Sequence, residues 1–212
     1  MTLKDRKLAQ RIYLYLGALF ITSLVVSNLI FQKFFYWNPF GEFTVFGVSL
    51  FEVSVGILPY PITFLITDLI SEIYGKKMAN QIVTAGIFAS FFSMGIILLA
   101  EVAPAIPTSP INDQTFTQVF ALSPIAVLAS MMAYLLAQYV DVAIYHFWKK
   151  LTKGKYLWLR NNFSTFLSQF LDTFTVVGLL CVFNVLPWEL FFGLVVSGFI
   201  FKIFIAFFDT PF

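Results

Sequence analysis

Four carboxylates lie within segments of this sequence that are otherwise hydrophobic: Asp68, Asp141, Asp172 and Asp209. A charged side chain in the hydrocarbon of a bilayer costs about 3 kcal/mol on insertion scales, so residues of this kind face a protein interior. They usually mark the path of a transported ion or substrate. Carboxylates accept hydrogen bonds and bind protons or cations. These four side chains are therefore the first candidates for a transport site.

The composition places these carboxylates in an integral membrane protein. Hydrophobic residues make up 59% of the 212 residues and charged residues only 11%, and the mean hydropathy is +0.87. Soluble domains of this size are far more polar. The net charge of +2 is a topology signal and does not indicate a nucleic-acid partner. With one cysteine, Cys181, and one histidine, His146, we expect neither a zinc or iron site of the usual kind nor a cofactor.

Hydrophobic runs near the length of about 20 residues that a helix needs to cross a bilayer predict six transmembrane helices. The expected fold is an all-α membrane protein in which residues 1–212 form a single domain. The predicted spans are Ile12–Phe31, Val55–Tyr74, Met78–Val102, Val119–Phe147, Phe163–Leu186 and Trp188–Phe208. Pro59 and Pro61 interrupt the outer end of the second span, where we favour a kink over a break into two pieces.

Basic residues predict the orientation of this six-span arrangement. Apart from Lys202, which lies within a span, every lysine and arginine except Lys33 falls on one side. The positive-inside rule places that side, and both termini, in the cytoplasm. On the outer side, residues 32–54 could form either a small hairpin or a plain loop, because apolar and polar residues alternate there. Residues 104–118 are rich in Pro, Ser, Thr and Asn and are expected to form a loop.

The predicted spans bring three acids and one base to a similar depth. Asp68 and Asp141 each lie eight residues before an inner basic residue, which is about 12 Å at 1.5 Å per residue. Asp172 lies about 18 Å past Arg160 by the same count, and Lys202 lies about 10 Å from the inner boundary. Because these residues come from four different helices, we expect them to share one polar chamber in the inner half of the membrane.

Other polar residues accompany the buried acids at helical spacing. Those one turn from an acid are Glu72, Gln138, Ser168 and Gln169. Asn28 lies in the first span, and Asp209 lies two turns beyond Lys202 near the inner end. The alternative is a closed network in which Lys202 pairs with an acid and the remaining residues tie helices together. For Glu72 and Asp209, ordinary anchoring at the inner boundary is an equal alternative, and for Asn28 the alternative is a contact between helices.

A chamber with several acids and one lysine is net acidic if all of them ionise, which is costly without compensation. A ligand rich in N–H donors, and flat enough to lie against Phe and Tyr rings, would suit such a chamber. A proton or a metal cation would also suit it.

The residues that carry this chemistry resemble those of a known family. The relevant segments are PITFLITDLISEIYGKK at Pro61–Lys77, SQFLDT at Ser168–Thr173, and the ending from Lys202 to Asp-Thr-Pro at 209–211. They resemble the queuosine precursor transporters, a branch of the vitamin uptake transporter family, over nearly the whole chain. The chain stops at Phe212, soon after Asp-Thr-Pro, where members of the family are expected to continue.

The resemblance implies a multi-pass importer of 7-deazaguanine bases in the bacterial inner membrane. It also implies a fold similar to that of the substrate-binding subunits of energy-coupling-factor transporters. The residues to which it assigns substrate recognition or coupling are Asp68, Glu72, Gln169, Asp172 and Lys202, with Asp209 behind them. The resemblance does not include Asp141, whose place in the site is supported by its depth in the membrane alone. The implied partners are a purine-like substrate and the lipid bilayer, and a coupling ion and a homo-oligomer stay open.

Three other functions can be weighed against the same sequence. The chain could be a substrate-binding subunit for a vitamin or base that docks on an ATP-driven module, because it contains no nucleotide-binding loop of its own. A membrane enzyme is disfavoured, since no His-Glu-x-x-His motif is present and no loop is long enough to form a catalytic domain. A purely structural scaffold would not need so many buried acids.

Overall fold

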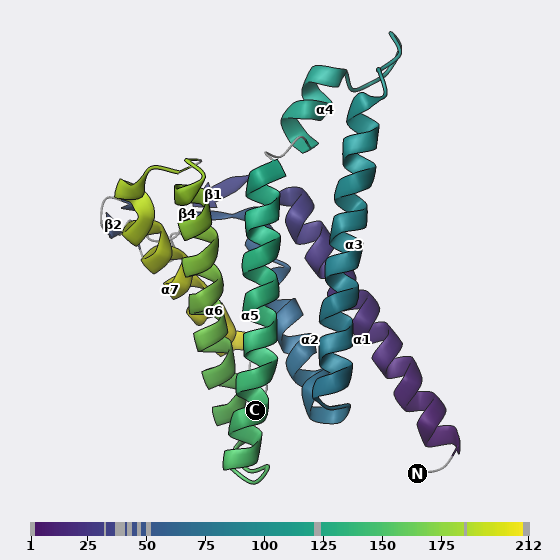
Figure 1. Cartoon of the computed structure of the whole chain (residues 1–212), viewed down its shortest axis with the longest axis vertical. Coiled ribbons are helices and arrows are strands. Elements are labelled where there is room, and N and C mark those ends of the chain that lie inside the picture. Colours follow the sequence, from purple (N-terminus) through teal and green to yellow (C-terminus); the bar gives the residue numbers. More distant parts are fainter. Residues whose placement is uncertain are drawn as a thin grey trace.

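The computed structural model describes residues 3–31, 33–36, 41, 44–45, 48–49, 52–120, 124–184 and 186–209. Helices dominate these residues, as the sequence predicts, and run roughly side by side along the longest axis of the molecule (Figure 1). The α-helices are α1 (Leu3–Ile30), α2 (Tyr60–Ile73), α3 (Lys76–Val102), α4 (Asp113–Phe120), α5 (Pro124–Leu151), α6 (Leu157–Val182) and α7 (Phe191–Asp209).

Four stretches of the described residues are long and apolar enough to cross a membrane, which supports a multi-pass membrane protein. They are Asp5–Ile30, Val55–Ile73, Lys76–Val102 and Asn162–Val182. The helices α5, with 28 residues, and α7, with 19 residues, lie alongside them. That the chain crosses the membrane six times stays a prediction.

The second predicted span is divided, so the expected kink at Pro59 and Pro61 is wrong. A 3₁₀ helix, η1 (Val55–Ile57), precedes α2, and Pro59 is the N-cap residue of α2. Pro61 lies in the first turn of α2, where backbone N–H groups have no partner within the helix. A proline there costs no hydrogen bond, so this Pro-Tyr-Pro step starts a helix and does not bend one.

The connections that the sequence predicts on the outer side contain more structure than plain loops. Two short antiparallel ribbons form before η1, and they confirm the hairpin alternative for residues 32–54. Their pairs are β1 (Phe34–Tyr36) with β4 (Glu52–Ser54) and β2 (Thr44–Val45) with β3 (Val48–Ser49). The expected loop at 104–118 is wrong in part, because α4 begins at Asp113. The fourth predicted span, from Val119, starts inside α4, while α5 begins at Pro124.

The ends of the last two predicted spans also shift. Helix α6 begins at Leu157, before the predicted start at Phe163, and it ends at Val182. A 3₁₀ turn, η2 (Trp188–Leu190), precedes α7. These shifts of three to six residues arise because hydropathy does not fix the ends of a helix.

Close packing of α1, α2, α3 and α5 forms the main apolar core. Its buried members include Phe20, Leu24, Phe64 and Val83. Gly86 of α3 allows α1 to approach closely, because a Cβ atom there would lie 2.6 Å from Cε1 of Phe20. Helix α5 also packs along α6, and α6 along α7. Asp68 of α2, Asp141 of α5, Asp172 of α6 and Lys202 of α7 are thereby held against neighbouring helices.

Candidate functional site

Two carboxyl groups from different helices meet in the interior of the bundle. The carboxyl of Asp68 on α2 lies close to that of Asp141 on α5 and to the hydroxyl of Thr165 on α6. The two aspartates are 4% and 0% exposed. Oγ of Ser168 lies 2.9 Å from Oδ1 of Asp141 and can donate to it. Because two carboxylates in contact cannot both stay ionised in a low dielectric, this pair can hold a proton.

A second acid on α6 pairs with the buried lysine. Nζ of Lys202 on α7 lies 2.5 Å from Oδ2 of Asp172, and the two side chains are 11% and 7% exposed. Asp172 follows Ser168 by four residues, which places it about 6 Å farther along α6. The pairing of Lys202 with an acid, which the sequence left as an alternative, is therefore present. The Asp68–Asp141 pair and the Asp172–Lys202 pair are called the acidic cluster below.

A chain of neutral polar groups extends from the acidic cluster along α5. Nε2 of Gln138 donates to Oη of Tyr134 at 2.9 Å and, more weakly, to Oγ1 of Thr63 at 3.5 Å. Tyr134 also meets Phe64 edge to face, with ring centroids 6.4 Å apart. All four side chains are buried.

Sequence reasoning missed three of the residues that contact the predicted site. Tyr134 precedes Asp141 by seven residues, and Thr165 precedes Asp172 by the same interval. Thr63 lies on α2, five residues before Asp68. An interval of seven returns to the same face of a helix, so extending the helical spacing from Asp and Gln to Tyr and Thr could have found the first two.

Four acceptor oxygens around the acidic cluster are buried without a hydrogen-bond partner. They are Oδ1 of Asp68, Oδ2 of Asp141, Oε1 of Gln138 and Oε1 of Gln169. Buried polar atoms in native proteins are nearly always hydrogen-bonded, so such a group of exceptions needs an explanation. A donor would satisfy them: an N–H or O–H group for the two amide oxygens, and either such a group or a shared proton for the two carboxyl oxygens.

Of three other predicted site residues, two lie apart from the acidic cluster and the side chain of the third lies outside the part of the chain that the structure describes. Glu72 accepts a hydrogen bond from Tyr145 at 2.6 Å and pairs with Lys149 at 2.8 Å, with the lysine and glutamate side chains 30% and 37% exposed. Asn28 lines a separate pocket with residues of α3. Asp209 ends α7, and its side chain lies outside the described part of the chain.

Comparison with known proteins identifies the family. Residues 54–212 match the family model described as "Putative vitamin uptake transporter". The chain belongs to this vitamin uptake transporter family. The matched part of the transporter begins just before η1 and contains the whole acidic cluster. This result confirms the family resemblance drawn from the sequence motifs, and it indicates a transport role for the chain.

One curated relative of this vitamin uptake transporter is a protein of Bacillus subtilis (strain 168), named "Probable queuosine precursor transporter". It is 26% identical over 171 residues, which cover 79% of this chain and 72% of the relative. No solved structure matches the chain.

Proposed function

We propose that this chain imports queuosine precursors, which are 7-deazaguanine bases such as preQ0, preQ1 or queuine. The observation that carries the proposal is the set of four buried, unpaired acceptor oxygens around the acidic cluster. A 7-deazaguanine offers N–H and NH₂ donors along one flat edge, which is the complement of such a set. The name of the Bacillus subtilis relative supports the same class of substrate.

In the proposed contacts, a carboxylate of the protein accepts hydrogen bonds from the N–H donors of the base. One carboxylate can accept two adjacent N–H groups, as it does from an arginine side chain. Asp172 and Asp68 take this role in our proposal, and the side-chain NH₂ group of Gln169 donates to the carbonyl of the base. The rings of Phe64 and Tyr134 are buried near these groups and provide flat surfaces for the base.

In this mechanism Lys202 binds the carboxylate of Asp172 until the substrate takes its place. In the empty transporter it holds Asp172 through the 2.5 Å contact, and the donors of the base replace it when substrate binds. The Asp68–Asp141 pair, which can hold a proton, gives the same site a means of coupling to an ion gradient. We place the protein in the bacterial inner membrane as a single domain with both termini in the cytoplasm, in accordance with its basic residues.

Uptake of radiolabelled preQ0 by cells that express the protein tests this function. Asp172→Asn is expected to abolish uptake while the protein still reaches the membrane, because the amide cannot accept two donors from the base. The matched control is Asp113→Asn, which changes an exposed acid of α4 outside the acidic cluster. It should leave uptake unchanged.

Two results would contradict the proposal. Cells with the unaltered protein that take up no more preQ0 than cells without it would exclude this function. Unchanged uptake by the Asp172→Asn variant would remove Asp172 from the site. If that single variant does not reach the membrane, the double substitution Asp172→Asn with Lys202→Met removes both charges together and provides the same test.

A further inference from the structure

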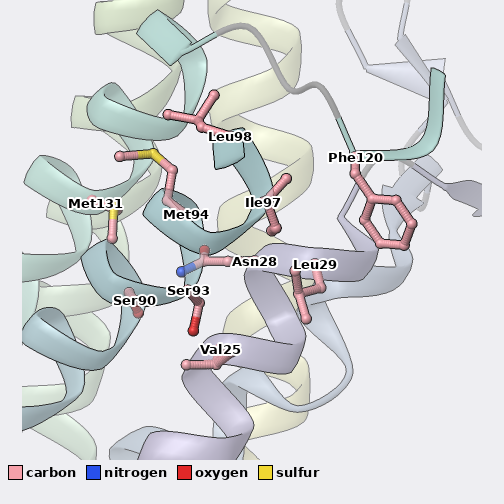
Figure 2. Close-up of a pocket in the computed structure, with 10 residues that line it drawn as sticks. All are labelled: Val25, Asn28, Leu29, Ser90, Ser93, Met94, Ile97, Leu98, Phe120 and Met131. Carbon is pink, nitrogen blue, oxygen red and sulfur yellow. The ribbon is translucent and has the colours of Figure 1, made fainter. Parts of the chain in front are cut away.

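Helices must separate before a base can reach or leave the acidic cluster. Asp68, Asp141 and Asp172 are 4%, 0% and 5% exposed. The pocket that Asn28 lines between α1 and α3 (Figure 2) has a cavity volume of about 40 Å³, and the cavity beside Tyr134 has one of about 10 Å³. Such volumes suit one or a few water molecules and are too small for a bicyclic base. The contacts between helices therefore determine where a path can open.

Polar contacts join α2 and α5 at successive turns. Nε2 of Gln138 on α5 lies 3.5 Å from Oγ1 of Thr63 on α2. About one turn farther along both helices, the carboxyl groups of Asp68 and Asp141 lie close together. Water can replace polar contacts of this kind when two helices part, because it both donates and accepts hydrogen bonds. This interface can therefore open without exposing a purely apolar surface.

The innermost of these contacts join Glu72 of α2 to Tyr145 and Lys149 of α5. Oη of Tyr145 donates to Oε2 of Glu72 at 2.6 Å, and Nζ of Lys149 lies 2.8 Å from the same oxygen. Glu72 and Tyr145 each follow one aspartate of the Asp68–Asp141 pair by four residues, which is about 6 Å along a helix. In the orientation that the basic residues predict, these contacts lie between the acidic cluster and the cytoplasm.

Tyr145 blocks the path at this level. Its side chain is fully buried, whereas that of Lys149, one turn farther along α5, is 30% exposed. Long side chains of a helix lean toward its N-terminus, so the Tyr145 ring covers the turn that carries Asp141. The ion pair of Glu72 with Lys149 is partly exposed and adds little. The hydrogen bond from Tyr145 is therefore the main polar contact that must break when α2 and α5 part here.

Other contacts hold α2 to α1 and α3 near the same level. Oη of Tyr74, just after α2, donates to the carbonyl of Ala9 on α1 at 2.7 Å. Oη of Tyr13 on α1 donates to the carbonyl of Met78 on α3 at 3.1 Å. Helix α2 is thus tied to α1 and α3 on one side, while α5 packs along α6 on the other.

We propose that the contacts of Glu72 with Tyr145 and Lys149 are the inner gate of the transporter, through which a base leaves the acidic cluster for the cytoplasm. The inference rests on the proposed function. The gate is closed in this structure. It opens when α1, α2 and α3 move together away from α5, and the charged groups of Glu72 and Lys149 then become solvated by water from the cytoplasm.

The accessibility of a single cysteine tests the gate without any substrate. Cys181→Ala removes the native thiol, and Ser71→Cys places one thiol next to Glu72 at a fully buried position. In inside-out membrane vesicles, a charged methanethiosulfonate approaches this thiol from the cytoplasmic side. Tyr145→Phe should raise the modification rate about tenfold, because losing one hydrogen bond to a charged group shifts an equilibrium by about that factor. An unchanged rate would overturn the gate.

Two matched controls accompany this measurement. Tyr139→Phe removes the same atom from the same helix, but Oη of Tyr139 lies 2.6 Å from Oγ1 of Thr84 on α3, so the rate at Ser71→Cys should not change. Lys77→Cys places the thiol at an exposed position at the start of α3, where Tyr145→Phe should have no effect. An equal rise in both tyrosine variants would show general loosening of α5 and would also overturn the gate.

A second measurement tests whether the base takes this path. Treatment of cells with N-ethylmaleimide should block preQ0 uptake by the Ser71→Cys variant and leave uptake by the Lys77→Cys variant unchanged. Normal uptake with the Ser71→Cys thiol fully modified would overturn the gate and leave the importer function intact. Absence of uptake by the unaltered protein would instead contradict the importer function, while the vesicle measurement would still decide the gate.

A second reporter covers the case in which Ser71→Cys does not reach the membrane. Thr67→Cys places the thiol one turn earlier on α2, at a position that is also fully buried. The same results are expected for it, and the same outcomes would overturn the gate.

Discussion

Lys202 on α7 and Asp172 on α6 form a buried ion pair in which Nζ and Oδ2 are 2.5 Å apart. The pair joins α6 and α7, which are consecutive helices. Asp172 is also the acid that the proposed substrate would contact. A charge that is buried in this way is stable only while its partner is present. The pair therefore links the stability of the empty transporter to the residues of its proposed site.

Removing one member of this pair should destabilise the protein more than removing both. Lys202→Met alone leaves the Asp172 carboxylate buried without its partner, at an expected cost of about 3 kcal/mol or more. The double variant with Asp172→Asn should recover much of the stability but no uptake. Thermal unfolding in detergent and preQ0 uptake measure the two effects. Equal stability of the single and double variants would contradict this account of the pair.

Ser168→Ala should weaken the contact between α5 and α6. The substitution removes the hydroxyl 2.9 Å from Oδ1 of Asp141, and loss of a hydrogen bond to a buried charged group costs about 1–3 kcal/mol. Thr152→Ala is the control, because its hydroxyl bonds only to the carbonyl of Trp148 one turn earlier in the same helix. If thermal unfolding changes equally in the two variants, the Ser168–Asp141 bond does not contribute in this way.

The ion pair of Glu72 with Lys149 should contribute little to stability. Its two side chains are 37% and 30% exposed, and exposed pairs of this kind contribute about 0–1 kcal/mol because water screens the charges. Lys149→Gln is therefore expected to lower the unfolding temperature only slightly, and less than Lys202→Met does. A loss as large as that for Lys202→Met would show that the Glu72 pair is as buried in the membrane as the Asp172 pair.

Gly86→Ala should separate α1 from α3. The new Cβ atom would lie 2.6 Å from Cε1 of Phe20, and this ring is fully buried. Such overpacking costs about 1–3 kcal/mol. Gly95→Ala on the same helix is the control, since nothing lies within 4 Å of its added Cβ, and alanine favours a helix over glycine by up to about 1 kcal/mol. Opposite shifts in thermal unfolding are expected, and a stabilising Gly86→Ala would contradict the close approach.

Much of the helical framework could be predicted from the sequence, because it depends on local properties. Helix α3 was predicted from Met78 and begins at Lys76, since hydrophobic length alone defines it. The division at Pro59 was not predicted, because a proline in a helical pattern is compatible with both a kink and a new helix start. The choice follows from contacts outside the helix: the Ser27 hydroxyl bonds the carbonyl of Gly56 and so fixes η1 against α1.

The sequence by itself determined the membrane class, the approximate helices and the three buried acids Asp68, Asp141 and Asp172, because hydropathy and helical spacing are properties of one segment at a time. Only the tertiary structure decided the partners: Asp68 with Asp141, Asp172 with Lys202, and Glu72 with Lys149 rather than with the acidic cluster. Helical spacing places residues on a face but leaves open how far each helix rotates about its axis. That rotation is set by packing between helices, as at Gly86 and along α5 and α6, and it determines which side chains meet.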